Sequence, residues 1–381
     1  MNHRLDLKQV ISILNWLFVL FPLSFIAGNF LVNFHFLLFI LFGVIYLKKK
    51  KIVFEYDYLL LIFFLFSLTL IIASVFNQFN IGKSITYLRF LFFYFICYYL
   101  IKDNKFNIER LLNYYAIFVL IITLDVIIQY SLDYNIVGYK IIAFGQNQTE
   151  VPTSFFFDEP IAGNFIQSFG FYFAFIVFYK FRKNNILNLL TKSFLISLMS
   201  ISIFLSYQRM PMILWVTFLL AYGGIYYKSK LFPILFSFIF FFMFVINFSS
   251  KEITENYDSF FKNIKTIGKK SFFNYKVIKD KELFEKIKVN ESIKSPIMTI
   301  SDFEKGSGHA SLFAETIYIW EDSKIFGIGY KNFYNKCVEK KLTRCTTHPH
   351  NLYFDVLVST GLLGLIFLIV FLILLFFKII Y

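Results

Sequence analysis

Long apolar runs alternate with short charged segments along most of the chain. Most runs are close to the roughly 20 residues that an α-helix needs to cross the hydrocarbon core of a bilayer. Because every backbone polar group in lipid must be paired within the protein, these runs predict membrane-spanning helices. The predicted spans are residues 10–27, 29–47, 58–76, 85–101, 111–130, 161–179, 189–207, 210–227, 231–248 and 352–377. The expected fold class is therefore an all-α polytopic membrane protein with about ten transmembrane helices.

The basic residues of the short loops predict the orientation of these helices. Cytoplasmic loops of membrane proteins carry an excess of lysine and arginine. Here the basic clusters fall at one set of alternate loops, residues 4–8, 48–51, 102–110, 180–183 and 228–230. The opposite short loops hold little beyond Lys83 and Lys140. Both termini are therefore expected in the cytoplasm, in agreement with an even number of spans.

This topology divides the chain into three regions. Residues 1–248 hold the first nine spans, residues 249–350 form one large extracytoplasmic loop, and residues 351–381 contain the last span. The loop is rich in lysine and glutamate, so we expect it to be mainly helical and exposed to water. In its second half, Leu312, Phe313, Ile317 and Trp320 predict an amphipathic helix that packs on the membrane side.

Composition and charge exclude two broad classes of protein. The chain is 58% hydrophobic and contains 56 phenylalanines, which is more apolar surface than a soluble domain can bury. The formal net charge of +14 would suggest a nucleic-acid ligand in a soluble protein. Here the lysines and arginines gather in loops, where they set the orientation, so we expect no nucleic-acid partner.

The three cysteines fall into two groups. Cys97 lies within a predicted span and is expected to behave as an apolar residue. Cys337 and Cys345 flank a short polar segment of the late loop. They are candidates for a disulfide if that compartment is oxidising, and the sequence alone leaves their pairing open.

Two arginines lie at the outer ends of spans, where a charge is costly. Arg209, in the outward turn SYQRMP, is either a fixed guanidinium for a phosphate or an interfacial arginine whose charge reaches the lipid headgroups. Arg89 is either a ligand for an anion in an outward cavity or the partner of Asp125, whose depth in the membrane is compatible. For Arg89 the residues favour the structural ion pair.

Asp158 and Glu159, in the segment SFFFDEPIAGNF, directly precede a predicted span. A carboxylate at the start of a helix can cap it and interacts favourably with the helix dipole. Two adjacent acids do not share one face of a helix, so they give only a weak signal for a metal site. We expect a capping or orienting role for both residues.

The motif THPHN joins His348 and His350 directly to the last span. Asn351 can cap the helix that follows, which places His350 at a positive helix end. Such an end attracts anions and lowers the pKa of an imidazole, which keeps the ring neutral and able to accept a proton. A plain helix cap with incidental histidines is the alternative. His309 is the only other histidine of the loop, so we expect no metal site.

Four segments occur in an order that resembles the O-antigen ligase and polymerase (Wzy/WaaL) superfamily. They are FFDEPIAGNF, LSYQRMP, ETIYIWEDSKIFGIGYKNFY and THPHNLYFDVLVSTGLLGL. In that family a large periplasmic loop is followed by a histidine–asparagine pair and two glycines, and here His350, Asn351, Gly361 and Gly364 stand at these positions. The resemblance implies a GT-C-like protein of the bacterial inner membrane.

The resemblance also implies a glycosyltransferase that uses no metal and no cofactor. Its donor would be an oligosaccharide on a polyprenyl diphosphate, with membrane lipid and a chain-length regulator as further partners. Arg209 would bind the diphosphate, where negative charge develops as the sugar bond breaks. His350 would be the base or would orient the acceptor, and His348 is a secondary candidate.

One position departs from the family pattern. Many members carry an arginine at the start of the helix before the GIG segment, where this chain has His309. His309 or Arg89 is then the candidate for the second phosphate ligand. The expected function is an O-antigen or surface-polysaccharide polymerase. The alternatives are a ligase that transfers the glycan to a lipid A core and, from a different class, a transporter or flippase of the same lipid-linked glycan.

Overall fold

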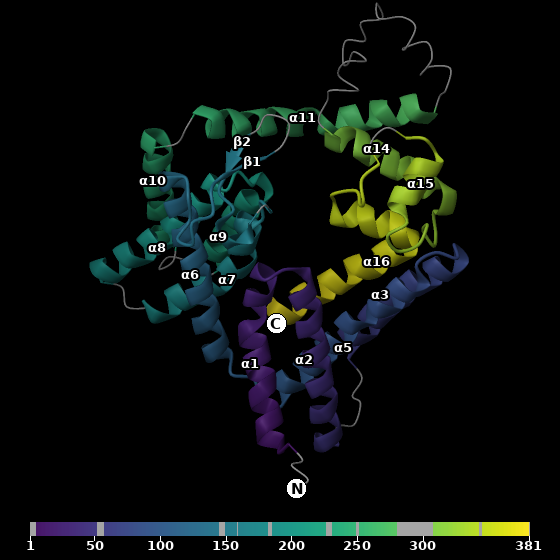
Figure 1. Ribbon diagram of the computed structural model, residues 1–381, viewed down its shortest axis with the longest axis horizontal. Coiled ribbons are helices and arrows are strands. Elements are labelled where there is room, and N and C mark those ends of the chain that lie inside the picture. The colour runs from purple at the N-terminus through teal and green to yellow at the C-terminus, as the bar shows by residue number, and fades with distance from the viewer. Residues whose placement is uncertain are drawn as a thin grey trace, which may run out of the picture. The chain divides into compact units, whose positions relative to one another are not determined.

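The computed structural model divides the chain into two compact units (Figure 1). The first unit comprises Met1–Lys49 and Leu100–Phe260, and the second comprises Lys50–Tyr99 and Phe261–Tyr381. The structure describes residues 5–51, 57–144, 149–157, 159–181, 185–225, 231–248, 251–279, 308–342 and 345–380.

Among the described residues, eight helices are long and apolar enough to cross a membrane. They are Leu7–Ile26, Asn29–Lys50, Tyr58–Phe76, Ile81–Lys102, Ile108–Leu132, Ala162–Lys180, Ile186–Leu205 and Leu352–Lys378. The other two predicted spans correspond to shorter apolar helices, Arg209–Gly223 and Pro233–Val245. The prediction of an all-α polytopic membrane protein is confirmed.

The first unit is a helical bundle whose core is formed mainly by its later helices. Its helices are α1 (Leu7–Ile26), α2 (Asn29–Lys50), α6 (Ile108–Leu132), α7 (Ala162–Lys180), α8 (Ile186–Leu205), α9 (Arg209–Ile225), α10 (Leu231–Phe248) and the start of α11 (Lys251–Lys279). Between α6 and α7 lie an antiparallel hairpin of β1 (Ile142–Phe144) and β2 (Thr149–Val151), in which Ala143 faces Glu150, and the 3-10 turn η1 (Ser154–Phe156). Trp215 of α9 is fully buried in this core.

Small polar side chains hold α8 against α10. Ser193 Oγ donates to the carbonyl of Pro233 at 3.1 Å, and Ser197 Oγ donates to the carbonyl of Ser237 at 3.0 Å. The spacing of four residues places both serines on one face of α8. Because serine is small, the two helices approach closely, and the hydroxyls add hydrogen bonds where lipid offers none.

The second unit packs its last helix along an early one. It contains α3 (Tyr58–Phe76), α4 (Ile81–Thr86), α5 (Leu88–Lys102), α14 (Gly308–Trp320), η2 (Glu321–Ser323), α15 (Phe333–Glu339) and α16 (Leu352–Ile380). Helices α3 and α16 lie side by side (Figure 1), with Phe66 and Leu70 buried against Val356. At one end of this pair Lys378 Nζ lies 2.7 Å from Asp57 Oδ2, an ion pair between the end of α16 and the start of α3.

The late loop contains the predicted helices. Helix α11 occupies its first part, and residues 280–307 lie outside the described residues. Helix α14 is the predicted amphipathic helix, and Leu312 is buried as expected. Leu312 and Ile319 pack on Phe333 of α15 and Val358 of α16. That this helix lies on the membrane side of the loop stays a prediction.

Gly361 interrupts α16 with φ 68° and ψ −167°. The backbone groups that lose helical partners are paired by residues 324–329. Ile328 N donates to the carbonyl of Val358 at 2.9 Å, and Gly329 N donates to that of Ser359 at 3.1 Å. In the opposite direction, the N–H groups of residues 362 and 363 donate to the carbonyls of residues 324 and 325 at 2.8 Å and 3.3 Å. These four hydrogen bonds replace helical pairing at the break, as broken helices of membrane proteins require.

The end of α3 holds the same loop from another side. Asn77 Nδ2 donates to the carbonyl of Gly327 at 3.1 Å, and Tyr330 N donates to Ser74 Oγ at 3.1 Å. The loop is thus fastened to both α3 and α16. This fixes the position of Tyr330, which borders the candidate site.

Candidate functional site

Three histidines converge in the second unit. The ring centroids of His348 and His350 are 4.3 Å apart, and those of His350 and His309 are 6.3 Å apart. His309 lies in the first turn of α14, and the other two precede α16. Beside them the rings of Phe313 and Phe354, 4.8 Å apart, join the two helices. The structure therefore brings three of the predicted site residues together.

The start of α16 sets the position of His350. Asn351 Oδ1 accepts hydrogen bonds from Tyr353 N at 3.0 Å and Phe354 N at 3.1 Å, so Asn351 caps the helix. His350 has φ 53°, in the left-handed region, and is exposed, whereas the preceding Pro349 is buried. The backbone thus presents the imidazole to solvent at the helix start.

Electrostatics favour a neutral ring at His350. Although the side chain is exposed overall, partial shielding of the ring from water lowers the pKa of His350 below 6.5, and the positive charges of His348 and His309 lower it further. At neutral pH the imidazole is therefore mainly unprotonated and able to accept a proton. Although three imidazoles lie close together, the described residues include no group of three or more His, Cys, Asp or Glu side chains arranged to hold a metal ion.

Tyr330 and Asp355 border this region and were missed by sequence reasoning. Burial raises the pKa of Tyr330, the Asp355 carboxylate raises it further, and the Arg89 guanidinium lowers it. The three groups therefore lie within electrostatic reach of one another. The sequence feature that could have indicated Asp355 is its position one helical turn after Asn351. In the structure Asp355 N donates to the carbonyl of Asn351 at 2.8 Å. Arg89 therefore lies close enough to Tyr330 of the late loop to interact with it electrostatically.

Arg209 lies in the first unit, at the start of α9. The preceding residues make a tight turn, in which Tyr207 has φ 58° and Gln208 Oε1 accepts from Asn164 N at 2.6 Å. The segment LSYQRMP is thereby joined to the start of α7 in the segment FFDEPIAGNF. Burial raises the pKa of Tyr257 of α11, and the charge of Arg209 lowers it, so α11 passes within electrostatic reach of the guanidinium.

Asp125 has hydrogen-bond partners within the first unit. Its Oδ1 accepts from Ile136 N at 2.9 Å, and its Oδ2 accepts from Ser154 Oγ at 2.6 Å. Arg89 belongs to the second unit, so an ion pair between Arg89 and Asp125 stays a prediction. The convergence of Arg209 with the histidines also joins residues of different units and stays a prediction.

Glu159 does not cap α7, so the capping part of that prediction is wrong, whereas an orienting role stays a prediction. The N-cap position is Ile161, which makes no side-chain cap hydrogen bond. The reason is a turn: Glu159 N donates to the carbonyl of Phe156 at 3.0 Å, and Ile161 N donates to that of Glu159 at 2.8 Å. This turn separates the acid from the helix. Asp158, the other predicted cap, lies outside the described residues.

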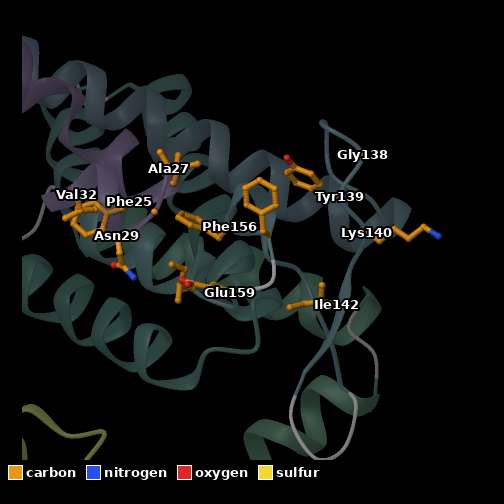
Figure 2. A pocket seen from close by; sticks show the side chains of 14 residues that line it. Phe25, Ala27, Asn29, Val32, Gly138, Tyr139, Lys140, Ile142, Phe156 and Glu159 are labelled. Atoms are coloured by element: carbon orange, nitrogen blue, oxygen red, sulfur yellow. The ribbon is translucent and has the colours of Figure 1, made fainter. Parts of the chain in front are cut away.

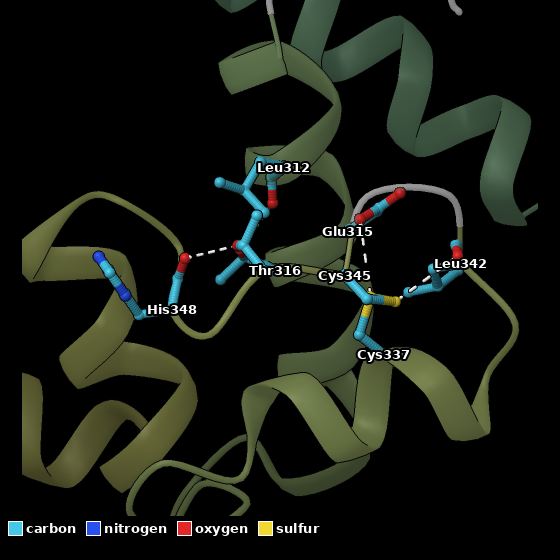
Figure 3. Close-up of a disulfide and its surroundings, with 8 residues drawn as sticks. Leu312, Glu315, Thr316, Cys337, Leu342, Cys345 and His348 are labelled. Atoms are coloured by element: carbon cyan, nitrogen blue, oxygen red, sulfur yellow. Dashed lines mark hydrogen bonds between the residues drawn. A yellow bond between two sulfur atoms is a disulfide. The ribbon is translucent and has the colours of Figure 1, made fainter. Parts of the chain in front are cut away.

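Cys337 and Cys345 form a disulfide (Figure 3). Their Cα atoms are 5.4 Å apart, and Cys337 is fully buried at the end of α15, beside Leu312 of α14. Just after Cys345, Thr346 Oγ1 donates to the carbonyl of His348 at 2.7 Å. The disulfide therefore restrains the segment that leads to the histidines.

Replacing both cysteines with serine is expected to lower the free energy of unfolding by about 2–3 kcal/mol, because the bond closes a short loop of the unfolded chain. Thermal unfolding of the purified protein measures this change. Dithiothreitol should lower the melting temperature of the wild type and leave that of the double variant unchanged. Equal melting temperatures for the wild type and the double serine variant, both measured without reductant, would contradict the prediction. The variant Cys97→Ala, outside the bond, is the control.

Comparison with protein families gives one match. Residues 194–369 match the model of a family described as O-antigen ligase. The matched region contains Arg209, the late loop and the histidines. The resemblance to the O-antigen ligase and polymerase superfamily is confirmed.

The match supports the function of this superfamily, a glycosyltransferase-like membrane enzyme. Searches of curated proteins and of solved structures returned no match. Among the described residues of the region that resembles O-antigen ligases, His309, His348 and His350 form a cluster of reactive side chains.

Proposed function

We propose that the protein is a polymerase that joins polyprenyl-diphosphate-linked repeat units of a surface polysaccharide on the extracytoplasmic side of the inner membrane. The observation that carries this proposal is the exposed imidazole of His350 at the capped start of α16. Its lowered pKa keeps the ring neutral, and the chain around it resembles O-antigen ligases. A neutral imidazole at this place can take the proton of an acceptor hydroxyl.

The proposed reaction is a glycosyl transfer. The acceptor oxygen forms a bond to the anomeric carbon of the donor sugar, and the bond from that carbon to the diphosphate breaks. The electron pair leaves with the diphosphate, and the hydroxyl proton passes to His350. His348, 4.3 Å away between ring centroids, would orient the ring or the acceptor. A diphosphate is a good leaving group when cations stabilise its charge, so the reaction as proposed requires no metal.

Arginine is the residue suited to that leaving group, because its planar guanidinium binds phosphate oxygens in pairs. Arg209 is the first candidate, by its place in the LSYQRMP segment. Arg89 and His309 are the candidates for a second contact, since both lie in the unit that carries His350. Each role is part of the proposal.

A ligase is the second candidate function. The matching family is described as O-antigen ligase, and the same chemistry would transfer a finished glycan to a lipid A core. The two functions differ in the acceptor and share the donor and the proposed base. A flippase would move the lipid-linked glycan without breaking the sugar–phosphate bond.

Two experiments test the proposal. Purified protein in liposomes, supplied with the lipid-linked repeat unit, is expected to lengthen the glycan without added metal or nucleotide. Deleting the gene and separating the surface polysaccharide on a gel distinguishes the candidates. Single-repeat caps indicate a polymerase, a bare core indicates a ligase, and donor retained on the cytoplasmic leaflet indicates a flippase.

Arg209→Ala is expected to lower kcat by about 10²–10³-fold, because the developing charge on the diphosphate loses its stabilising cation. Arg209→Lys should recover only part of this loss, since a lysine has no planar fork. The elongation assay in liposomes measures both variants. Arg110→Ala, at a loop predicted to be cytoplasmic, is the matched control and should keep full activity. An Arg209→Ala enzyme as active as this control would remove Arg209 from the proposed site.

A further inference from the structure

A cavity of about 770 Å³ lies in the first unit, apart from the residues given chemical roles above (Figure 2). Its walls come from the turn between α1 and α2 and from the connection between α6 and α7, which contributes Gly138, Tyr139, Lys140, Ile142, Phe156, Phe157, Glu159 and Ile161. The turn and the loop of residues 131–160 are both predicted to be extracytoplasmic. The volume lies within the range of about 300–1,000 Å³ that is typical of small-molecule sites.

Two aromatic rings form one wall of this cavity. The ring centroids of Tyr139 and Phe157 are 4.5 Å apart, with an angle of 40° between the ring planes. Phe157 is 54% exposed and has φ 54°, an uncommon backbone conformation for a bulky residue. Conformations of this kind persist where the surrounding structure imposes them, and they cluster at binding sites. The Phe157 side chain is thus held partly exposed in the lining of the cavity.

Besides the Tyr139 hydroxyl, three polar side chains line the same cavity, those of Asn29, Lys140 and Glu159. They supply an amide, an ammonium and a carboxylate, so their net charge is zero. None of the described side chains forms an ion pair with Lys140 or Glu159. Figure 2 shows Lys140 at one edge of the lining, with its side chain directed away from Glu159, so the two charged groups do not pair with each other.

This combination selects a class of ligand. A diphosphate or an anionic headgroup needs an excess of positive charge, which Lys140 and Glu159 together do not provide. An acyl or prenyl chain would leave the amide and the two charged groups without partners. A neutral sugar fits both the aromatic and the polar side chains of the lining, because its C–H faces pack on aromatic rings and its hydroxyls donate and accept hydrogen bonds.

We propose that this cavity is a glycan-binding subsite that holds sugar rings of the repeat unit away from the reacting bond. The inference rests on the proposed function, because it takes the ligand to be part of the glycan that the enzyme transfers. Phe157 and Tyr139 provide the stacking surface, and Asn29, Lys140 and Glu159 bind hydroxyl groups. Such a subsite adds binding energy from parts of the substrate that do not react, which positions the reacting end.

Direct binding tests the subsite without turnover. The probe is the repeat-unit oligosaccharide released by mild acid from the strain's own surface polysaccharide. It is titrated into full-length protein in phosphatidylcholine nanodiscs, which contain no sugar detergent, and followed by saturation-transfer NMR. Phe157→Ala is expected to bind about three- to tenfold more weakly, the effect of losing one ring contact. Glu159→Gln should also bind more weakly, whereas Phe157→Tyr, which keeps the ring, should bind as the wild type does.

Ile136→Ala is the matched control, because Ile136 is 62% exposed in the same loop and lies outside the cavity lining. Equal affinity for wild type, Phe157→Ala and Glu159→Gln would overturn the proposal, as would a wild type that does not bind the probe. Phospholipid that co-purifies with the wild type and is lost in Phe157→Ala would assign the cavity to a lipid and also overturn it. Probe binding that depends on Phe157, in a protein that fails to elongate glycan in liposomes, would uphold the subsite and refute the polymerase.

Discussion

His350→Ala is expected to lower kcat by about 10²–10⁴-fold in the liposome elongation assay, the usual contribution of a general base. The imidazole is exposed, so its removal should leave the melting temperature close to that of the wild type. His350→Gln keeps a polar side chain but has no group that can take the proton at neutral pH. It should therefore be as inactive as the alanine variant.

The pH dependence gives a second measurement of the same residue. Because partial shielding from water and two neighbouring imidazoles lower the pKa of His350 below 6.5, the ring is mainly neutral in the neutral pH range. The rate should be constant at neutral pH and should fall as the pH drops through the lowered pKa and the ring becomes protonated. The same shift means that the folded state binds fewer protons at this site than the unfolded state, so its contribution to stability is lost below about pH 6.5.

Variants of the neighbouring rings provide the controls. His309→Ala removes one of the charges that lower the pKa of His350, so the acid limb of the rate profile should move to higher pH. His35→Ala, in the first unit, should leave that limb in place. If the His350→Ala variant keeps the wild-type rate, or if the acid limb of its pH–rate profile is the same as in the wild type, His350 is not the base.

Gly361→Ala is expected to prevent the second unit from folding. A Cβ at this position would lie 2.2 Å from the carbonyl oxygen and 2.3 Å from the carbonyl carbon of Ile325, and the residue has φ 68°. Both atoms belong to backbone that pairs with α16, so neither can move without breaking hydrogen bonds. Strain and lost pairing together should cost more than about 4 kcal/mol, a large part of the stability of an ordinary domain.

The yield of monodisperse protein and its melting temperature measure this effect. Gly327→Ala should behave in the same way, because its Cβ would lie 2.5 Å from the backbone of Ser359 and Thr360. Gly82→Ala is the matched control: nothing lies within 4 Å of its added Cβ, and it stands within α4. A Gly361→Ala protein as stable as Gly82→Ala would show that the break in α16 is not required.

Much of this architecture is predictable from the sequence because it depends on local pattern. Apolar runs of the right length identify the helices, since the bilayer requires both apolar side chains and internal backbone pairing. The cap at Asn351 is predictable for the same reason, because its partners lie two and three residues further along the chain. The convergence of His348 and His350 also follows from their spacing.

The remainder depends on contacts between distant segments. The bond from Tyr330 N to Ser74 joins residues 256 positions apart, so no local pattern records it. Asp355 resembles any acid in the first turn of a helix until Tyr330 and Arg89 are placed beside it. Glu159 was misassigned because the turn at Pro160 adds residues between a good capping side chain and the helix. Leu312 and Ile319 face α15 and α16, which periodicity alone does not distinguish from a lipid-facing stripe.

The break at Gly361 changes where the last crossing of the bilayer begins. Residues 362–380 form a helix of about 28 Å at 1.5 Å per residue, which nearly equals the thickness of a hydrocarbon core. Its partner α3 runs from Asp57, paired with Lys378, to Asn77, bonded to Gly327 beside the break. The two helices are therefore matched in length, and Leu352–Thr360 precedes the break, with Val356 packed against Phe66 and Leu70 of α3. The break thus separates a helix long enough to cross a bilayer from the turn that carries His350, and the nine residues between them are held by α3.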